Sequence, residues 1–131
     1  MKKILSFGFI NILSENIAEI IIDNNVVITL EMIDEYDQFL TEYFKGDFGL
    51  LVNRINHYSY TFEAKLCLGS IEGLRAMAVV YYNDLGKEST NNFFSTRTVD
   101  NFNFKLFPGL ELGWQSGLDW LNHELKDVNN G

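Results

Sequence analysis

The first apolar residues of the chain follow the pattern of β-strands. Residues 3–13 and 17–22 are rich in Ile and Phe, and the polar residues 14–16 (SEN) form a break short enough for a hairpin. The sequence therefore predicts two antiparallel strands over residues 3–13 and 17–22.

Between Thr29 and Lys45 the spacing of the apolar residues changes to three or four. The residues of this apolar stripe are Leu30, Ile33, Tyr36, Leu40 and Phe44. Such a spacing is typical of one face of an α-helix, and acidic residues fill much of the rest. We therefore predict an amphipathic helix whose acidic side faces solvent, with Thr29 as its N-terminal cap.

Two short stretches are almost continuously apolar, residues 48–55 (FGLLVNRI) and 76–82 (AMAVVYY). This pattern is typical of strands covered on both faces, so we expect two central, parallel strands. Parallel neighbours need a crossover connection, and residues 61–74 are long enough to hold its helix. The stretch 56–70 (NHYSYTFEAKLCLGS), which concentrates polar and reactive side chains, is then the turn after a central strand and the entry to this helix.

The last third of the chain contains one irregular stretch and two clearer elements. Residues 83–97 are predicted to form a loop and a shorter helix that buries Phe93 and Phe94. Residues 102–107 alternate apolar and polar side chains, as a strand nearer the sheet edge would. The final helix is expected to bury one apolar face, made of Trp114, Leu118, Leu121 and Leu125.

Together these elements predict the order β-β-α-β-α-β-α-β-α, which is an α/β sandwich. Its sheet of about five strands would be mixed but mostly parallel, with about four helices packed on it. No linker, internal repeat or low-complexity tract divides the sequence. We therefore expect residues 1–131 to form a single domain.

Composition excludes several kinds of partner. The formal net charge of −8 would repel nucleic acid, and no basic run interleaved with aromatic residues compensates for it. No apolar stretch approaches the length of a membrane span. The opening MKKILSFGFINIL imitates a secretory signal, but Asn11 interrupts its apolar stretch and no small-residue cleavage site follows, so we expect a strand there.

Cysteine and histidine usage is equally restrictive. The single cysteine, Cys67, cannot form an intramolecular disulfide, and no Cys or His cluster has the spacing of a zinc site. The sequence therefore predicts a cytoplasmic protein without a metal or another cofactor. Cys67 could act as a nucleophile only with His57 as its base, and the two lie about ten residues apart, nearly three helical turns of rise.

The order of elements resembles that of the SpoIIAA-like proteins of the STAS superfamily, in their small standalone form. The stretches that carry this resemblance are LEMIDEYDQFL at 30–40, GLLVNRINHYSYTFEA at 49–64, AMAVVYY at 76–82 and GLDWLNHEL at 117–125. The resemblance covers nearly the whole chain. It implies a mostly parallel sheet with four helices and a cytoplasmic protein that is often dimeric, and it implies no particular reaction.

The resemblance also implies a candidate phosphosite. In the anti-sigma-factor antagonists of this superfamily, a partner kinase phosphorylates a serine at the start of the second helix, which abolishes binding to that partner. Ser59 is the nearest match and Thr61 the next. The family has an Asp just before the serine and a Gly soon after it, whereas Tyr58 and Tyr60 flank Ser59 here. Thr61 also suits a helix cap, and Glu63 lies near the positive end of that helix.

Five aromatic residues form a second candidate site: Tyr58, Tyr60, Phe62, Tyr81 and Tyr82. The first three follow one central strand and the other two end its neighbour. All five are therefore expected at the carboxyl edge of the sheet, where open α/β sheets bind ligands. Such a cluster lines an apolar pocket, contacts a protein partner or packs around an ordinary loop.

Two functions follow from these observations. The first is a non-enzymatic domain, with a regulatory role, that binds a protein partner and forms a homodimer. The alternative is a carrier of a small apolar or lipid-like ligand, because the superfamily resembles the CRAL-TRIO lipid-transfer proteins in architecture. A carrier needs a connected apolar cavity near residues 56–62, whereas an interaction domain can be solid there and expose an apolar patch.

Overall fold

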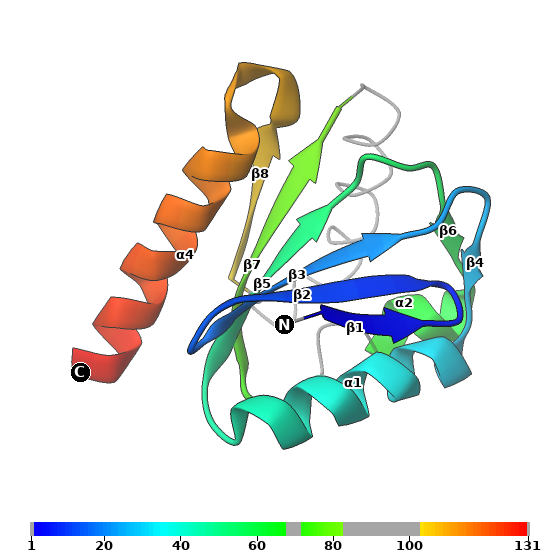
Figure 1. The fold of residues 1–131 in the computed structure, drawn as a ribbon, viewed down its shortest axis with the longest axis horizontal. Helices are drawn as coiled ribbons and strands as arrows, with labels where there is room; N and C mark the ends of the chain where they lie inside the picture. Colours follow the sequence, from blue (N-terminus) through cyan, green and yellow to red (C-terminus); the bar gives the residue numbers. More distant parts are fainter. Residues whose placement is uncertain (1, 68–71, 83–102, 131) are drawn as a thin grey trace.

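The computed structural model describes residues 2–67, 72–82 and 103–130. Within these residues the main sheet contains six strands in the order β1 (Lys2–Leu5), β2 (Gly8–Ser14), β3 (Ile17–Ile22), β5 (Phe48–Asn53), β7 (Leu74–Tyr81) and β8 (Phe104–Pro108). Helices α1 (Leu30–Phe44) and α2 (Phe62–Cys67) cover one face, and α4 (Gly113–Asn130) covers the other (Figure 1). The fold is therefore α/β, with a mixed sheet between two helical layers.

The predicted first strand, residues 3–13, is two strands joined by a tight turn. β1 pairs with β2 in antiparallel register, with Leu5 opposite Gly8. Glycine is required at this turn because a Cβ on Gly8 would overlap the carbonyl oxygen of Ile21 in β3. The predicted antiparallel pairing across residues 14–16 is confirmed, since β2 pairs with β3 in that sense.

The centre of the sheet is parallel, as the continuous apolar stretches predict. β3, β5, β7 and β8 are mutually parallel neighbours. All six residues of β5 are buried, because α1 and α4 pack on its opposite faces. β8 lies at the edge of the sheet, where its alternating sequence places it.

Helix α1 begins and ends where its sequence predicts. The Thr29 hydroxyl accepts a hydrogen bond from the backbone N–H of Met32 at 3.3 Å, and Lys45 ends the helix in a left-handed conformation. Ile33, Tyr36 and Leu40 form its buried stripe. Their burial fixes this helix against the sheet.

Helix α4 packs on the opposite face through Leu121 and Leu125, which are fully buried against β5 and β7. The described residues contain three α-helices and a short 3₁₀ helix, η3 (Gly109–Glu111). The predicted shorter helix around Phe93 and Phe94 lies outside the described residues. No helix in the described part of the chain is long and apolar enough to cross a membrane.

A second, two-stranded sheet was not expected from the sequence. β4 (Val27–Ile28) and β6 (Ser59–Tyr60) pair in parallel beside the main sheet (Figure 1). Each strand has only two residues, too few for an alternating pattern to be recognised. This small sheet positions the candidate site.

Candidate functional site

The small sheet brings two helix starts together at one corner of the molecule. Val27 pairs with Ser59 in parallel register. The backbone N–H of Thr61 then donates to the carbonyl oxygen of Ile28 at 2.9 Å. Because β4 leads into α1 and β6 leads into α2, the first turns of these helices are neighbours (Figure 1).

Both helix starts are capped by a threonine. The cap on α1 is Thr29, as described above, and the Thr61 hydroxyl accepts from the backbone N–H of Ala64 at 3.2 Å. The predicted cap at Thr61 is therefore confirmed. Each hydroxyl satisfies a backbone donor that would otherwise lack an acceptor, which fixes the course of the chain at this corner.

Large apolar side chains are exposed at the same corner. Phe62 is 71% exposed, Val27 52% and Leu30 39%. Beside them lies an open groove of about 370 Å³, which we call the α1–α2 groove. The described residues that line it are Thr29, Leu30, Glu31, Thr61 and Glu63. An exposed phenylalanine next to a groove marks a surface suited to contact with another molecule.

The described residues that line the α1–α2 groove carry negative charge. Glu31 and Glu63 are both exposed and lie in the first turns of α1 and α2. The N-terminus of a helix carries a partial positive charge equivalent to roughly half an elementary charge. Two carboxylates outweigh this, so the groove attracts positive groups.

Tyr58 and Tyr60, predicted as part of an aromatic surface, pack inward under α1. Their rings meet edge to face with centroids 5.6 Å apart, and their hydroxyl oxygens are 3.5 Å apart. The Arg54 guanidinium lies 4.4 Å from the centre of the Tyr58 ring, and its Nη2 donates to the Tyr58 carbonyl oxygen at 3.0 Å. The cavity left beside the two tyrosines is about 10 Å³, which holds one water molecule at most.

Burial dominates the ionisation of these tyrosines. It raises the pKa of Tyr36 and Tyr58 well above the ordinary value of 10.0, and it raises the pKa of Tyr60. The positive charge of Arg54 opposes this increase in the pKa of both Tyr58 and Tyr60. The cluster is therefore neutral at physiological pH and serves as a core around one buried arginine.

The structure separates the remaining aromatic residues of the predicted set. Phe62 faces solvent at the α1–α2 groove. Tyr81 and Tyr82 end β7 and follow it, and successive residues of a strand point to opposite faces. Tyr82 accordingly packs with the α4 side of the core, away from Tyr58 and Tyr60. The five residues do not form one surface.

The two candidate phosphosites differ in accessibility. Ser59 is exposed on β6, whereas Thr61 is half-buried and uses its hydroxyl as the helix cap. Both lie beside the α1–α2 groove, and Thr61 is part of its lining. Of the two, Ser59 is the more open to a modifying enzyme.

A buried carboxylate, which sequence reasoning missed, lies on the α4 side of the sheet. Glu19 in β3 is 6% exposed, and its Oε2 accepts from Trp114 Nε1 at 2.7 Å and from Asn53 Nδ2 at 3.0 Å. Its Oε1 accepts from Asn11 Nδ2 at 3.1 Å. This network joins β2, β3 and β5 to the first turn of α4. The available signal was a lone carboxylate within the otherwise apolar stretch IAEIII.

Two further polar groups lie near Glu19, the side-chain oxygen of Asn53 and the hydroxyl of Tyr82. Asn53 Oδ1 is buried and accepts no hydrogen bond within the described residues. Partial burial and then the negative charge of Glu19 raise the pKa of Tyr82, while a hydrogen bond from Asn53 lowers it. The three donors to Glu19 come from two strands of the sheet and from α4, so the network links the two layers and has a structural role.

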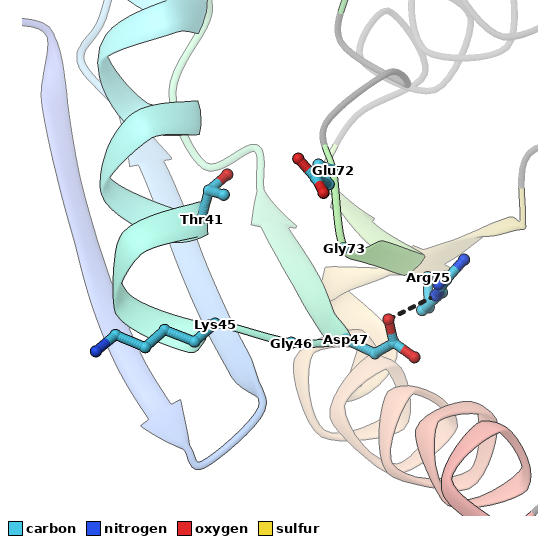
Figure 2. A pocket seen from close by; sticks show the side chains of 7 residues that line it. All are labelled: Thr41, Lys45, Gly46, Asp47, Glu72, Gly73 and Arg75. Carbon is cyan, nitrogen blue, oxygen red and sulfur yellow. Dashed lines mark ion pairs between the residues drawn. The ribbon is translucent and has the colours of Figure 1, made fainter.

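A second open pocket, of about 290 Å³, lies at the opposite, amino end of β5 and β7. Figure 2 shows the ion pair between Arg75 and Asp47, whose Nε and Oδ1 atoms are 2.8 Å apart, with Lys45 pointing away from it. Arg75 is more than half exposed, and ion pairs of this kind contribute about 0–1 kcal/mol. With Glu72 also in its lining, this pocket offers neighbouring charges of both signs and no preference for one kind of ligand.

Comparisons with known proteins add no assignment. No family model, no curated protein and no solved structure matches the chain. The described residues contain no group of three or more His, Cys, Asp or Glu side chains that could hold a metal ion. The functional argument therefore depends on the geometry of the α1–α2 groove and its surroundings.

Proposed function

We propose that this chain is a non-enzymatic binding domain that contacts a protein partner at the α1–α2 groove. The observation that carries the proposal is the exposure of Phe62, 71%, beside a groove of about 370 Å³. Aromatic side chains are enriched at the centres of protein interfaces, because they bury a large apolar area with few rotatable bonds.

The carrier function has less support. Ligand cavities for small molecules commonly have volumes of about 300–1,000 Å³. The cavity beside Tyr58 and Tyr60, where a carrier pocket was expected, is about 10 Å³. Among the described residues near this loop, side chains fill the space beside Tyr58 and Tyr60, and the large side chain of Phe62 is exposed to solvent.

A SpoIIAA-like assignment fits this proposal, since its best-understood members act by binding partners. Within it, phosphorylation of Ser59 is the proposed means of regulation, because Ser59 is exposed and pairs with Val27 next to the groove. A homodimeric state and a cytoplasmic location belong to the same hypothesis.

The proposed function predicts that Phe62→Ser weakens binding without changing the fold. Peptides selected by the wild-type protein from a displayed library of random short sequences should bind Phe62→Ser about tenfold more weakly or worse. Its free energy of unfolding should change by no more than about 0.5 kcal/mol, because the side chain is exposed. Fluorescence anisotropy measures the affinity, and urea denaturation measures the stability.

The matched control is Leu110→Ser. Leu110 is 83% exposed in η3, far along the chain from the groove, so its replacement should leave peptide affinity unchanged. Equal binding by the Phe62 variant and the wild type, or failure of the wild type to select any peptide, would contradict the proposed site. Native mass spectrometry supplies a second check, because a small molecule that co-purifies and leaves on denaturation would favour the carrier.

A further inference from the structure

The chemistry of the α1–α2 groove also restricts its partner. We infer that the segment bound there carries arginine or lysine next to a large apolar side chain. This inference rests on the proposed function, since it describes the partner of the same site. It follows from three features: two exposed carboxylates that form no ion pair within the described residues, the exposed Phe62 ring beside the groove, and the occupied helix caps.

The carboxylates of Glu31 and Glu63 are available to a partner. Both are exposed and both line the groove, and within the described residues neither takes part in an ion pair. Carboxylates bind guanidinium groups through two parallel hydrogen bonds, a geometry that ammonium groups lack. Arginine is therefore the better match, and lysine the second.

The apolar side chains supply the other half of the match. Phe62 stands in the chain between Thr61 and Glu63, two residues that line the groove, and its ring is exposed to solvent. A guanidinium group can stack on an exposed aromatic ring as well as pair with a carboxylate, so this surface offers arginine two kinds of contact. Leu30 and Val27 extend the apolar area on the adjacent strand and helix, which favours an apolar neighbour of the basic residue.

An anionic partner fits this site poorly. A helix N-terminus attracts anions through its free backbone N–H groups, but here Thr29 and Thr61 each occupy one of these groups, and Glu31 and Glu63 add negative charge beside them. The chain as a whole carries a formal net charge of −8, which adds repulsion of any acidic segment. Charge complementarity therefore selects a cationic and apolar protein segment.

The peptides selected from the random library provide the test. Compared with the unselected library, they should be enriched in Arg, and less strongly in Lys, next to Leu, Ile, Phe or Trp. Replacing both acids, Glu31→Gln with Glu63→Gln, should weaken their binding about tenfold or more, since close charge pairs at interfaces contribute about 1.5 kcal/mol or more. Circular dichroism confirms that the variant is folded.

The control pair is Glu15→Gln with Glu111→Gln, two exposed acids from the β2–β3 turn and from η3. It changes the net charge by the same amount, so it separates local pairing from long-range attraction. If both pairs weaken binding equally, or if the selected peptides are neutral or acidic, the inference is overturned. If such peptides still depend on Phe62, the proposed function survives that result; if they do not, both fail.

Discussion

Glu19 is the residue whose environment is most demanding, because a buried carboxylate is stable only when its oxygens accept enough hydrogen bonds. Asn11, Asn53 and Trp114 supply three N–H donors to it. Two of these donors come from the sheet, and the third comes from α4. Glu19 therefore links the sheet to α4, and replacing it should lower the stability of the whole fold.

We predict that Glu19→Gln lowers the free energy of unfolding by about 1–3 kcal/mol. Glutamine has an N–H₂ group where glutamate has a second carboxylate oxygen, so at least one of the three N–H donors would lose its acceptor and face another donor. Urea denaturation followed by tryptophan fluorescence measures the change. Glu15→Gln, on an exposed turn of the same hairpin, is the control and should shift stability by no more than about 0.5 kcal/mol. Equal urea denaturation midpoints for the two variants would refute the proposal that Glu19 stabilises the contact between the sheet and α4.

At the scale of elements, two glycines lie close together where α1 leads to β5 and where the chain enters β7. Gly73 has a φ of +87°, and a Cβ added there would lie 2.9 Å from the carbonyl oxygen of Gly46. Gly46 itself would accept a Cβ, since the nearest atom that it would meet is 3.9 Å away. The two positions therefore differ in backbone conformation and in space while they share one surface (Figure 2).

We predict that Gly73→Ala destabilises the protein by about 1–3 kcal/mol, through its left-handed backbone and the close approach. Gly46→Ala should be neutral or slightly stabilising, because alanine reduces the freedom of the unfolded chain. Thermal or urea unfolding of the two variants measures the difference. A Gly73→Ala protein as stable as Gly46→Ala would show that neither effect operates.

How well an element could be predicted from the sequence depended on its length. α1 has 15 residues and α4 has 18, so their apolar stripes repeat often enough to be recognised, and β5 and β7 are continuous apolar stretches. β4 and β6 have two residues each, too few to show a periodic pattern in the sequence. The turn between β1 and β2 was missed because Phe7 is apolar, although Gly8 marked the position.

Only the local features of the candidate site could be predicted from the sequence. The stretch 56–62 was identified as the entry to a helix, and both the cap at Thr61 and the exposure of Ser59 agree with that position. Which aromatic residue faces out was not predictable, because it depends on the pairing of β6 with β4. That pairing buries Tyr60 under α1 and leaves Phe62 outside.

At the scale of the whole molecule, the sheet has a hydrophobic core on each face, and each core contains tyrosine. Tyr36, Tyr58 and Tyr60 belong to the α1 side and Tyr82 to the α4 side. In all four, burial raises the pKa above its ordinary value of 10.0. Alkaline pH should therefore destabilise the packing on both faces of the sheet.

This sensitivity gives a prediction for the stability of the fold. Below about pH 10 the tyrosines are protonated in both the folded and the unfolded chain, so their contribution is fully present. Above it, tyrosines of the unfolded chain lose protons that the folded chain retains, and the free energy of unfolding falls as pH rises toward the folded pKa values. Each tyrosine contributes a slope of up to about 1.4 kcal/mol per pH unit.

Urea denaturation at a series of alkaline pH values, with tyrosinate absorbance recorded in parallel, measures this dependence. Tyr58→Phe should retain a shallower slope than the wild type, because one strongly shifted group is gone while the ring still fills its place under α1. If the free energy of unfolding stayed constant through this range, or if Tyr58→Phe matched the wild-type slope, Tyr58 would not be protected from ionisation by its burial. A fall that begins before tyrosinate appears would point instead to repulsion among the acidic groups of a chain whose formal net charge is already −8 at pH 7.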